Sequence, residues 1–240
     1  MVLLGTNFDE NMVLNGTESR GPLRKQAEAK PAASPLDALE PRRRCILEAA
    51  YAVLMERGYA GASTLEIATR ARVSKRELYA EFGSKAGMLR ALIAATSTRM
   101  RLPLEVGEVS SPEDLAALLL RYGISVLTEL TSAPVLAINR LAIAEAGRAS
   151  EIGRILEEAG REPNRRALID AVAKAQAAGA LGDGDPEIVA GQFFSLLMGD
   201  LMMRLLLDVT PRPRAKEIRR RAQAATDSVL ALHSSVRRRG

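Results

Sequence analysis

The sequence predicts an all-α protein in which a small N-terminal three-helix domain with a helix-turn-helix precedes a larger helical domain. Alanine, leucine and arginine dominate the 240 residues, and all three favour helix. Apolar residues recur at spacings of three and four in one segment after another, which is the period of amphipathic helices. Two Ser-x-x-Glu signals, Ser63 with Glu66 and Ser74 with Glu77, indicate two short helices joined by a tight turn.

The composition excludes several classes of function. A single cysteine, Cys45, and a single histidine, His233, leave no material for a disulfide framework, a zinc module, a histidine metal cluster or a Ser-His-Asp triad. Aromatic residues make up 3% and tryptophan is absent, which excludes a surface that stacks bases on rings. We therefore predict no enzyme activity, no cofactor and no metal, and we expect Cys45 to be a small buried hydrophobe.

The positive charge is concentrated in one segment. Residues 41–101 carry twelve basic and five acidic side chains, whereas residues 102–240 carry eighteen of each and residues 1–40 are slightly acidic. A basic module on a neutral body predicts a polyanion partner for that module, the alternative being a solvated helical face.

No segment reads as a targeting or membrane-spanning sequence. The opening apolar run is too short for a signal peptide, and charged residues interrupt the most apolar stretch, 188–209. We expect a soluble, cytoplasmic protein without a membrane partner, and the lone cysteine fits a reducing compartment.

Residues 1–40 show no sustained period and contain several prolines, so we expect a disordered tail in which Met12 is an alternative start. Its basic side chains, Arg20, Arg24, Lys25 and Lys30, are either a DNA-contacting arm or, given the acidic residues among them, part of an inert tail. Structure is expected to begin after Pro41, where an apolar stripe from Ile46 to Leu54 predicts a helix that ends at Gly58.

The predicted helix-turn-helix covers about residues 63–82 within a domain of residues 41–100. On a helical wheel, Leu78 and Phe82 lie within about 40° of each other and point into the core. The opposite face of the second helix carries Arg76 and Ala80, flanked by Glu77 and Tyr79. A long bidentate donor, a small residue and a phenol suit a helix that reads a major groove. Taken singly, Arg76 would be interpreted as a solvated surface residue and Tyr79 as a half-buried core residue.

This region resembles the N-terminal domain of the TetR/AcrR family of transcriptional regulators. The resemblance rests on Ile46 to Ala50, Glu56 to Tyr59, Glu66 to Ala68, and the pattern VSK-x-x-LY-x-x-F-x-SK from Val73 to Lys85. Three departures stand out. Arg72 replaces the usual turn glycine and must take a left-handed or adjusted conformation, Arg76 and Glu77 replace small residues, and Ala62 replaces a frequent threonine.

The resemblance implies the following roles. Thr64 would bind a phosphate at the start of its helix, and Ser63 or Thr64 would bind the phosphate that an alanine at position 62 cannot reach. Lys75, Arg76 and Glu77 would approach base edges beside Ala80, with Arg76 reading guanine, and Glu77 either accepting from cytosine or orienting Arg76. Tyr79 and Lys85 would hold phosphates on either side.

The second domain, residues 101–236, is expected to contain only helices. A long helix should end near Pro103, and further helices are predicted from Pro112, over 135–145, at 152–156, over 164–178, over 186–209 and after Pro213. Asp185 followed by Pro186 is a helix cap and start, so Gly182 to Asp185 reads as a turn rather than a phosphate or metal loop.

The predicted helix 186–209 is apolar nearly all round, so one of its sides needs a partner. In the family that the sequence resembles, the last two helices, here 186–209 and 214–233, form the four-helix bundle of a homodimer. Residues 140–146 and 192–201 also resemble the effector domain of the AefR-like branch. Side chains that either line an effector pocket or belong to an ordinary core are Tyr122, Asn139, Phe193, Met198 and Met202.

These features favour a homodimeric, ligand-responsive repressor that binds a palindromic operator and is released by a small-molecule effector. The alternatives are a helical small-molecule-binding protein or enzyme that carries a helix-turn-helix, and a constitutive DNA-binding protein without an effector.

Overall fold

A computed structural model describes residues 36–37, 39–106, 108–147 and 150–234. Within these residues every regular element is a helix, which confirms the predicted all-α class. Most of the predicted tail, including Met12 and the basic residues at 20–30, lies outside them. At its described end the tail prediction is wrong, because Leu36 is 7% exposed and packs into a hydrophobic core.

Three helices form the N-terminal part: α1 (Pro41–Gly61), α2 (Thr64–Ala71) and α3 (Lys75–Phe82). Gly58 interrupts α1 at a φ of 69° and a ψ of 174°, as predicted, and one further turn follows it. Ser63 caps α2 by accepting from Glu66 N, while Ser74 and Glu77 form a complete capping box on α3. The two sequence signals therefore place both helices to within one residue.

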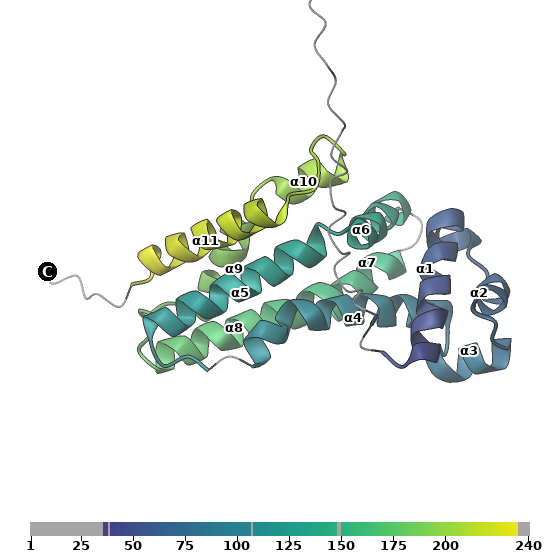
Figure 1. Ribbon diagram of the computed structural model, residues 1–240, viewed down its shortest axis with the longest axis horizontal. Helices are drawn as coiled ribbons and strands as arrows, with labels where there is room; N and C mark the ends of the chain where they lie inside the picture. The colour runs from purple at the N-terminus through teal and green to yellow at the C-terminus, as the bar shows by residue number, and fades with distance from the viewer. Residues whose placement is uncertain (1–35, 38, 107, 148–149, 235–240) are drawn as a thin grey trace, which may run out of the picture. The chain divides into compact units, whose positions relative to one another are not determined.

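Two long helices and a shorter one follow: α4 (Lys85–Glu105), α5 (Pro112–Leu130) and α6 (Ala133–Glu145). No single helix of the described residues is long and apolar enough to cross a membrane; α5 and α6 reach that length only as a pair bent by 63°. Helix α5 is largely a core helix, since it packs along α4 and α11 (Figure 1).

The next three elements run on without a break: α7 (Ser150–Leu156), the π-helical turn η1 (Glu157–Arg161) and α8 (Glu162–Ala177). The prediction of a short helix followed by a separate one opened by Pro163 is therefore wrong. Proline cannot donate to the carbonyl of residue 159 and its ring crowds that carbonyl. The wider π turn directly before Pro163 accommodates both effects, so the helix continues through it.

The predicted helix 186–209 is also wrong as a single element. It consists of α9 (Pro186–Met198) and α10 (Leu201–Leu206), separated at Gly199, whose φ is 47°. Asp185 caps α9 as expected. The side chain of Arg221, on the last helix α11 (Ala215–Leu232), donates to the carbonyls of Leu197 and Met198 and so ends α9 from outside.

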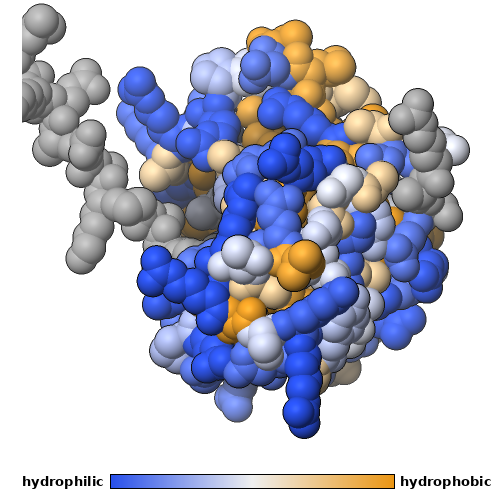
Figure 2. All heavy atoms as spheres, turned by 90° about the vertical axis from the view of Figure 1, so that its right-hand side faces the viewer, coloured by the Kyte–Doolittle hydropathy of each residue, from blue (hydrophilic) through white to orange (hydrophobic). Residues whose placement is uncertain are grey.

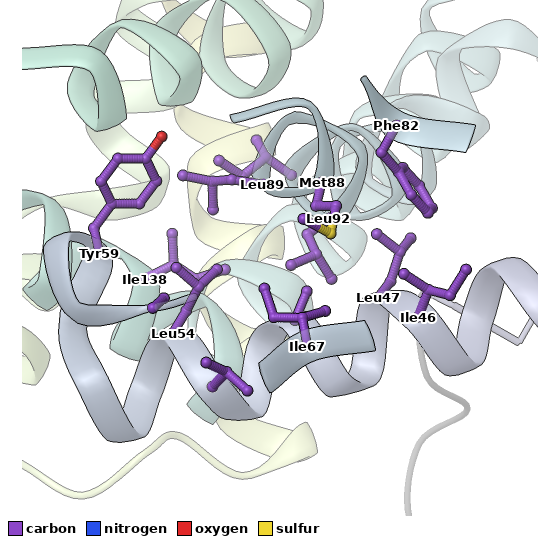
Figure 3. Packing of buried hydrophobic residues seen from close by; sticks show 14 of the residues in the cluster. Ile46, Leu47, Leu54, Tyr59, Ile67, Phe82, Met88, Leu89, Leu92 and Ile138 are labelled. Carbon is purple, nitrogen blue, oxygen red and sulfur yellow. The ribbon is translucent and has the colours of Figure 1, made fainter. Parts of the chain in front are cut away.

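The interior consists of two clusters. The N-terminal core, part of which Figure 3 shows, joins α1 to α3 and the first half of α4 to Ile138 of α6 and to Ile152 and Ile155 of α7. The C-terminal core joins α5, α8, α9 and α11 to Met100 at the other end of α4. A domain boundary at residue 100 stays a prediction, and the two clusters do not follow it, because α6 and α7 pack on the N-terminal core.

Two polar features complete the packing. The carboxylate of Glu129 on α5, 5% exposed, pairs with Arg99 of α4 at 2.9 Å, and burial raises the pKa of Glu129 while the guanidinium opposes that shift. Cys45 is exposed, so the expectation of a buried cysteine is wrong: its Sγ lies 3.7 Å from the carbonyl of Ala71, off the stripe that begins at Ile46.

Candidate DNA-binding interface

Helix α3 presents the predicted reading face to solvent. Leu78 is fully buried and Phe82 is 8% exposed, and both anchor α3 in the N-terminal core. Figure 3 shows Phe82 among the other side chains of that core. The exposed side chains of α3 include all those assigned to base or phosphate contacts, namely Lys75, Arg76, Glu77, Tyr79 and Ala80. Figure 2 looks onto the end of the molecule that carries α1 to α3, and hydrophilic side chains dominate that face.

The turn between α2 and α3 depends on Arg72. Its φ of 53° and ψ of 43° place it in the left-handed region, at the position where the family that the sequence resembles usually has glycine, and its N–H donates to the carbonyls of Ala68 and Thr69. A non-glycine residue in this conformation costs roughly 1 kcal/mol. The packing of α2 and α3 on the N-terminal core must offset that cost. The left-handed conformation expected for this residue is thus confirmed.

Ion pairs link α1 to α3. Arg42 pairs with Glu77, and Arg43 pairs with Glu81 and lies 4.9 Å from the centre of the Phe82 ring. Both arginines belong to the first turn of α1. No local sequence pattern reveals these pairs, because the partners are 35 and 38 residues apart.

Glu77 has a different set of partners from those expected. Its carboxylate accepts from the N–H of Ser74 in the capping box and pairs with Arg42. The hydrogen bonds to Ser74 lower the pKa of Glu77, and Arg42 adds to this effect. The interpretation that Glu77 orients Arg76 finds no support here, and a contact of Glu77 with cytosine would compete with the cap.

Tyr79 and Thr64 face each other across the two helices of the motif. Thr64 Oγ1 lies 3.3 Å from Tyr79 Oη, and both residues are on the solvent side. The Nζ of Lys75 lies 5.8 Å from the centre of the Tyr79 ring. Three of the predicted DNA contacts are therefore neighbours. Ser63 has a different role, because its hydroxyl accepts from the N–H of Glu66 and so caps α2.

Lys85 is placed differently from the prediction. Its ammonium donates to the carbonyls of Tyr59 and Ala62, the latter at 3.1 Å, and lies 4.4 Å from the centre of the Tyr59 ring. Burial lowers the pKa of Lys85, and Glu151 and Glu145 oppose that shift. This arrangement holds the end of α1 against the start of α4, so the Lys85 ammonium is directed to carbonyls of the protein itself and not to an external phosphate.

The same junction reaches α7. The hydroxyl of Tyr59 donates to Glu151 Oε2 at 2.6 Å, and burial raises the pKa of Tyr59, with Glu151 adding to the shift. The sequence offers no signal for this bond across 92 residues, yet it ties the N-terminal helices to the segment after α6.

The five residues proposed for an effector pocket do not share one environment. Tyr122 and Phe193 are each 1% exposed, with ring centroids 6.2 Å apart, and Met198 and Met202 pack with them in the C-terminal core. Asn139 lies on α6 outside that core and donates to the carbonyl of Val135. Within the described residues, no group of three or more histidine, cysteine or carboxylate side chains is arranged to hold a metal.

Helix α3 is short, starts at a capping box, is anchored in the N-terminal core by Leu78 and Phe82, and carries Lys75 and Arg76 on its exposed face. Together with α2 and the tight turn before it, this arrangement defines a helix-turn-helix DNA-binding protein. Residues 46–92 match the profile of bacterial regulatory proteins of the tetR family, and residues 117–234 match the C-terminal domain of AefR-like transcriptional repressors.

Individual relatives agree with these matches. The chain is 34% identical over 92 residues to the HTH-type transcriptional regulator YvkB of Bacillus subtilis (strain 168); the match covers 38% of this chain and 47% of YvkB. A solved TetR transcriptional regulator from Agrobacterium tumefaciens is 30% identical with a TM-score of 0.67, over 81% of this chain and 95% of that one. The flavonoid-responsive regulator FrrA is 28% identical with a TM-score of 0.64, over 80% and 96%. The chain belongs to the TetR family of transcriptional regulators.

Proposed function

We propose that the protein is a homodimeric repressor that binds a palindromic operator through α3 and is released by a small organic effector. The observation that carries the DNA-binding part is the exposed face of α3. Lys75 and Arg76 on that face, and Arg72 in the turn before it, have no carboxylate partner within 4 Å among the described residues, so they are available to an external anion.

Arg76 is the residue that we expect to read a base. A bidentate arginine contact with guanine contributes about 1–3 kcal/mol of discrimination, whereas phosphate contacts contribute equally on every sequence. Thr64 and Tyr79, which lie together, are suited to one phosphate, and Lys75 approaches the bases beside Ala80.

The test is operator binding by Arg76→Ala, with the operator first selected from a random-sequence duplex pool. We expect a loss of about 1–3 kcal/mol on the selected site and little change on random DNA. Arg121→Ala, at an exposed arginine of α5, is the control and should bind both duplexes like the parent protein. Equal losses on selected and random DNA would refute a base-reading role.

The proposed dimer face is formed by α9 and α10. These two helices, with the C-cap residue of α10, expose large apolar side chains, each between 38% and 64% accessible: Ile188, Phe194, Leu196, Met203 and Leu207. An apolar surface of this kind is unfavourable in water and is typical of an interface. Helix α11 (Ala215–Leu232), which packs against α9, would complete the bundle over about 214–233.

The effector is proposed to bind beside the C-terminal core, near Tyr122, Phe193, Met198 and Met202. The name of FrrA, a relative that responds to flavonoids, supports an aromatic organic ligand. Helix α4 would transmit binding, because it starts next to α3 and contributes Met100, near its other end, to the C-terminal core. Half-sites lie ~34–36 Å apart, so a small change in the separation of two α3 helices weakens simultaneous binding.

A thermal-shift screen with a flavonoid panel separates this function from its two alternatives. A ligand that binds the folded state raises the unfolding midpoint, and an effector must also lower operator affinity. Stabilisation without any effect on DNA binding would contradict the effector role and favour a small-molecule-binding protein or an enzyme. Absence of any stabilising ligand would favour a constitutive DNA-binding protein.

A further inference from the structure

Two ion pairs lie along one side of α3. Arg42 and Arg43, at the start of α1, pair with Glu77 and Glu81 of α3, and Figure 1 shows the start of α1 next to α3. The four side chains are between 37% and 58% exposed, so a phosphate can reach them. They line a hollow between α1 and α3 to which Ala80 also contributes. Because Ala80 belongs to the proposed reading face, the two pairs border the surface that a bound duplex would cover.

The pairs lie on the opposite side of the reading face from Thr64 and Tyr79. At 100° per residue, Glu77 and Tyr79 flank Arg76 from opposite sides. Glu81 lies one turn beyond Glu77 on the same side, and Thr64 meets Tyr79 at 3.3 Å on the other. A helix in a major groove has a phosphate backbone on each side of it. A duplex read by α3 would therefore bring one backbone to Thr64 and Tyr79 and the second to the start of α1.

Arg42 and Arg43 have the chemistry that the second backbone requires. Lys85, which the family resemblance assigned to a phosphate, instead donates to carbonyls of the protein. A guanidinium group binds a phosphate through two parallel hydrogen bonds. Exposed ion pairs contribute little to stability, so a phosphate that comes close can replace the carboxylate. Arg43 also lies 4.9 Å from the centre of the Phe82 ring, which keeps its guanidinium beside α3.

Glu77 does not depend on Arg42 for its position. Its Oε2 accepts from the N–H of Ser74 in the capping box, and its Oε1 pairs with Arg42. Release of Arg42 therefore leaves Glu77 in the cap of α3. While the pair is intact, the carboxylate neutralises the guanidinium, which then contributes little to the attraction between the protein and a duplex that lies further away.

We propose that Arg42 and Arg43 exchange their carboxylates for backbone phosphates when α3 enters the major groove of an operator. On random-sequence DNA, Glu77 and Glu81 keep both arginines paired. The exchange needs a phosphate within hydrogen-bond distance of the start of α1, and base contacts by Arg76 hold α3 that deep in the groove only on an operator. The two carboxylates thus determine specificity without touching a base. The proposal rests on the proposed function, because it requires α3 to be the reading helix.

The experiment measures the slope of log K against log salt on the selected operator and on a random-sequence duplex. Arg42→Gln/Arg43→Gln removes the two cations. Glu77→Gln/Glu81→Gln removes the two carboxylates, and glutamine at position 77 still suits a capping box. Each phosphate contact contributes about 0.9 to the magnitude of the slope.

The matched controls come from an ion-pair group of the same composition on α8 and α9. Arg165 and Arg166 are adjacent, and they pair with Glu162 and Glu187. Arg165→Gln/Arg166→Gln and Glu162→Gln/Glu187→Gln therefore change the net charge by the same amounts, away from α1 and α3. Both control variants should keep the slopes of the parent protein on both duplexes.

We expect Arg42→Gln/Arg43→Gln to reduce the magnitude of the operator slope by about 2–4 per dimer and to leave the slope on random DNA unchanged. Glu77→Gln/Glu81→Gln should do the reverse: the slope on random DNA should rise by about 2–4 per dimer, because the freed arginines can now bind phosphates of any sequence. The operator slope should stay the same, since the arginines already bind phosphates in that complex.

An operator slope that Arg42→Gln/Arg43→Gln leaves unchanged would overturn the phosphate contact. Equal reductions on the two duplexes would overturn the exchange, and so would control variants that change the slopes as much as their counterparts. Circular dichroism checks the fold of each variant. If loss of the Arg43–Phe82 contact unfolds the arginine variant, Glu77→Gln/Glu81→Gln still decides, because an unchanged slope on random DNA overturns the proposal. Failure of the parent protein to select any operator would instead refute the proposed function itself.

Discussion

The two cores of this protein differ in how completely a single chain covers them. Around the N-terminal core, α1 to α3 face solvent mostly with charged side chains, many of them in ion pairs, and Leu65 and Tyr79 are the large apolar residues most exposed there. Around the C-terminal core, α9 and α10 expose a row of large apolar side chains such as Ile188 and Met203. The N-terminal part thus exposes mainly charged side chains, some of them unpaired cations, and needs no partner to cover apolar surface. The C-terminal part exposes an apolar surface that suits a second copy of the chain.

The largest expected effect comes from Phe193→Ala. Phe193 is 1% exposed and stacks near Tyr122 in the C-terminal core. We expect a loss of about 3–5 kcal/mol in the free energy of unfolding, since the substitution leaves a cavity among packed side chains. Urea unfolding at a fixed chain concentration measures it.

Phe194→Ala is the matched variant, because the next side chain along α9 is 38% exposed. We expect it to affect the dimer rather than the fold, with a midpoint that becomes more dependent on chain concentration. Equal losses of unfolding free energy for Phe193→Ala and Phe194→Ala, with an unchanged association state, would contradict the contrast between the two cores. The exposed face of α9 would then have no part in association.

An intermediate effect is expected from Gly199→Ala. Gly199 has a φ of 47°, and an added Cβ would lie 2.8 Å from Arg221 Nη2, the group that ends α9. We expect a cost of about 1–3 kcal/mol from the backbone conformation and the displaced arginine. Gly179→Ala is the control, because its φ is 72° but no atom lies within 4 Å of the added carbon. A Gly199→Ala cost no greater than that of Gly179→Ala in thermal unfolding would contradict the role of Arg221.

The smallest effect concerns pH. The N-terminal carboxylates Glu40, Glu56 and Glu77 have lowered pKa values, so their stabilisation is present above about pH 4.5 and is lost as the pH falls. Burial raises the pKa of Glu129, so the folded state holds its proton more tightly than the unfolded state does. Its contribution is therefore greatest below pH 4.5 and declines as the pH rises through the folded-state pKa.

Glu129→Gln should remove that decline. We expect the difference in unfolding free energy between the variant and the parent to change by less than about 1 kcal/mol over about pH 4–8, because Arg99 is one third exposed and solvent screens the pair. Urea unfolding as a function of pH measures it. We expect the parent to lose unfolding free energy relative to Glu129→Gln as the pH rises. A difference between the two proteins that stays constant, or a parent that gains relative to the variant, would contradict the raised pKa.

The sequence predicted those parts of the fold that depend on neighbouring residues. Ser63, Ser74 and Asp185 cap helices within three residues of their own position, and Leu78 and Phe82 face inward because of helical spacing. The errors depend on distant residues. The break at Gly199 is fixed by Arg221 on another helix, and the continuous run through Pro163 depends on a π turn that no residue pattern announces.

The candidate site follows the same division. The exposure of Arg76 and Tyr79 follows from the wheel of α3 alone, and the assignment of DNA contacts to them remains a prediction. Glu77 and Lys85 differ from expectation because Arg42 and the carbonyls of Tyr59 and Ala62 reach them across the fold.

The N-terminal core is built from α1 to α4 together with residues of α6 and α7, and this has a practical consequence for protein engineering. A chimera of two regulators would join the helix-turn-helix part of one to the remaining helices of the other. Here a graft cut after α4 would separate Ile138, Ile152 and Ile155 from the side chains they bury, and would also sever the bond between Tyr59 and Glu151. A chimera that keeps its host's fold must therefore carry α6 and α7 together with α1 to α4, or redesign their contact surface on α1 and α4.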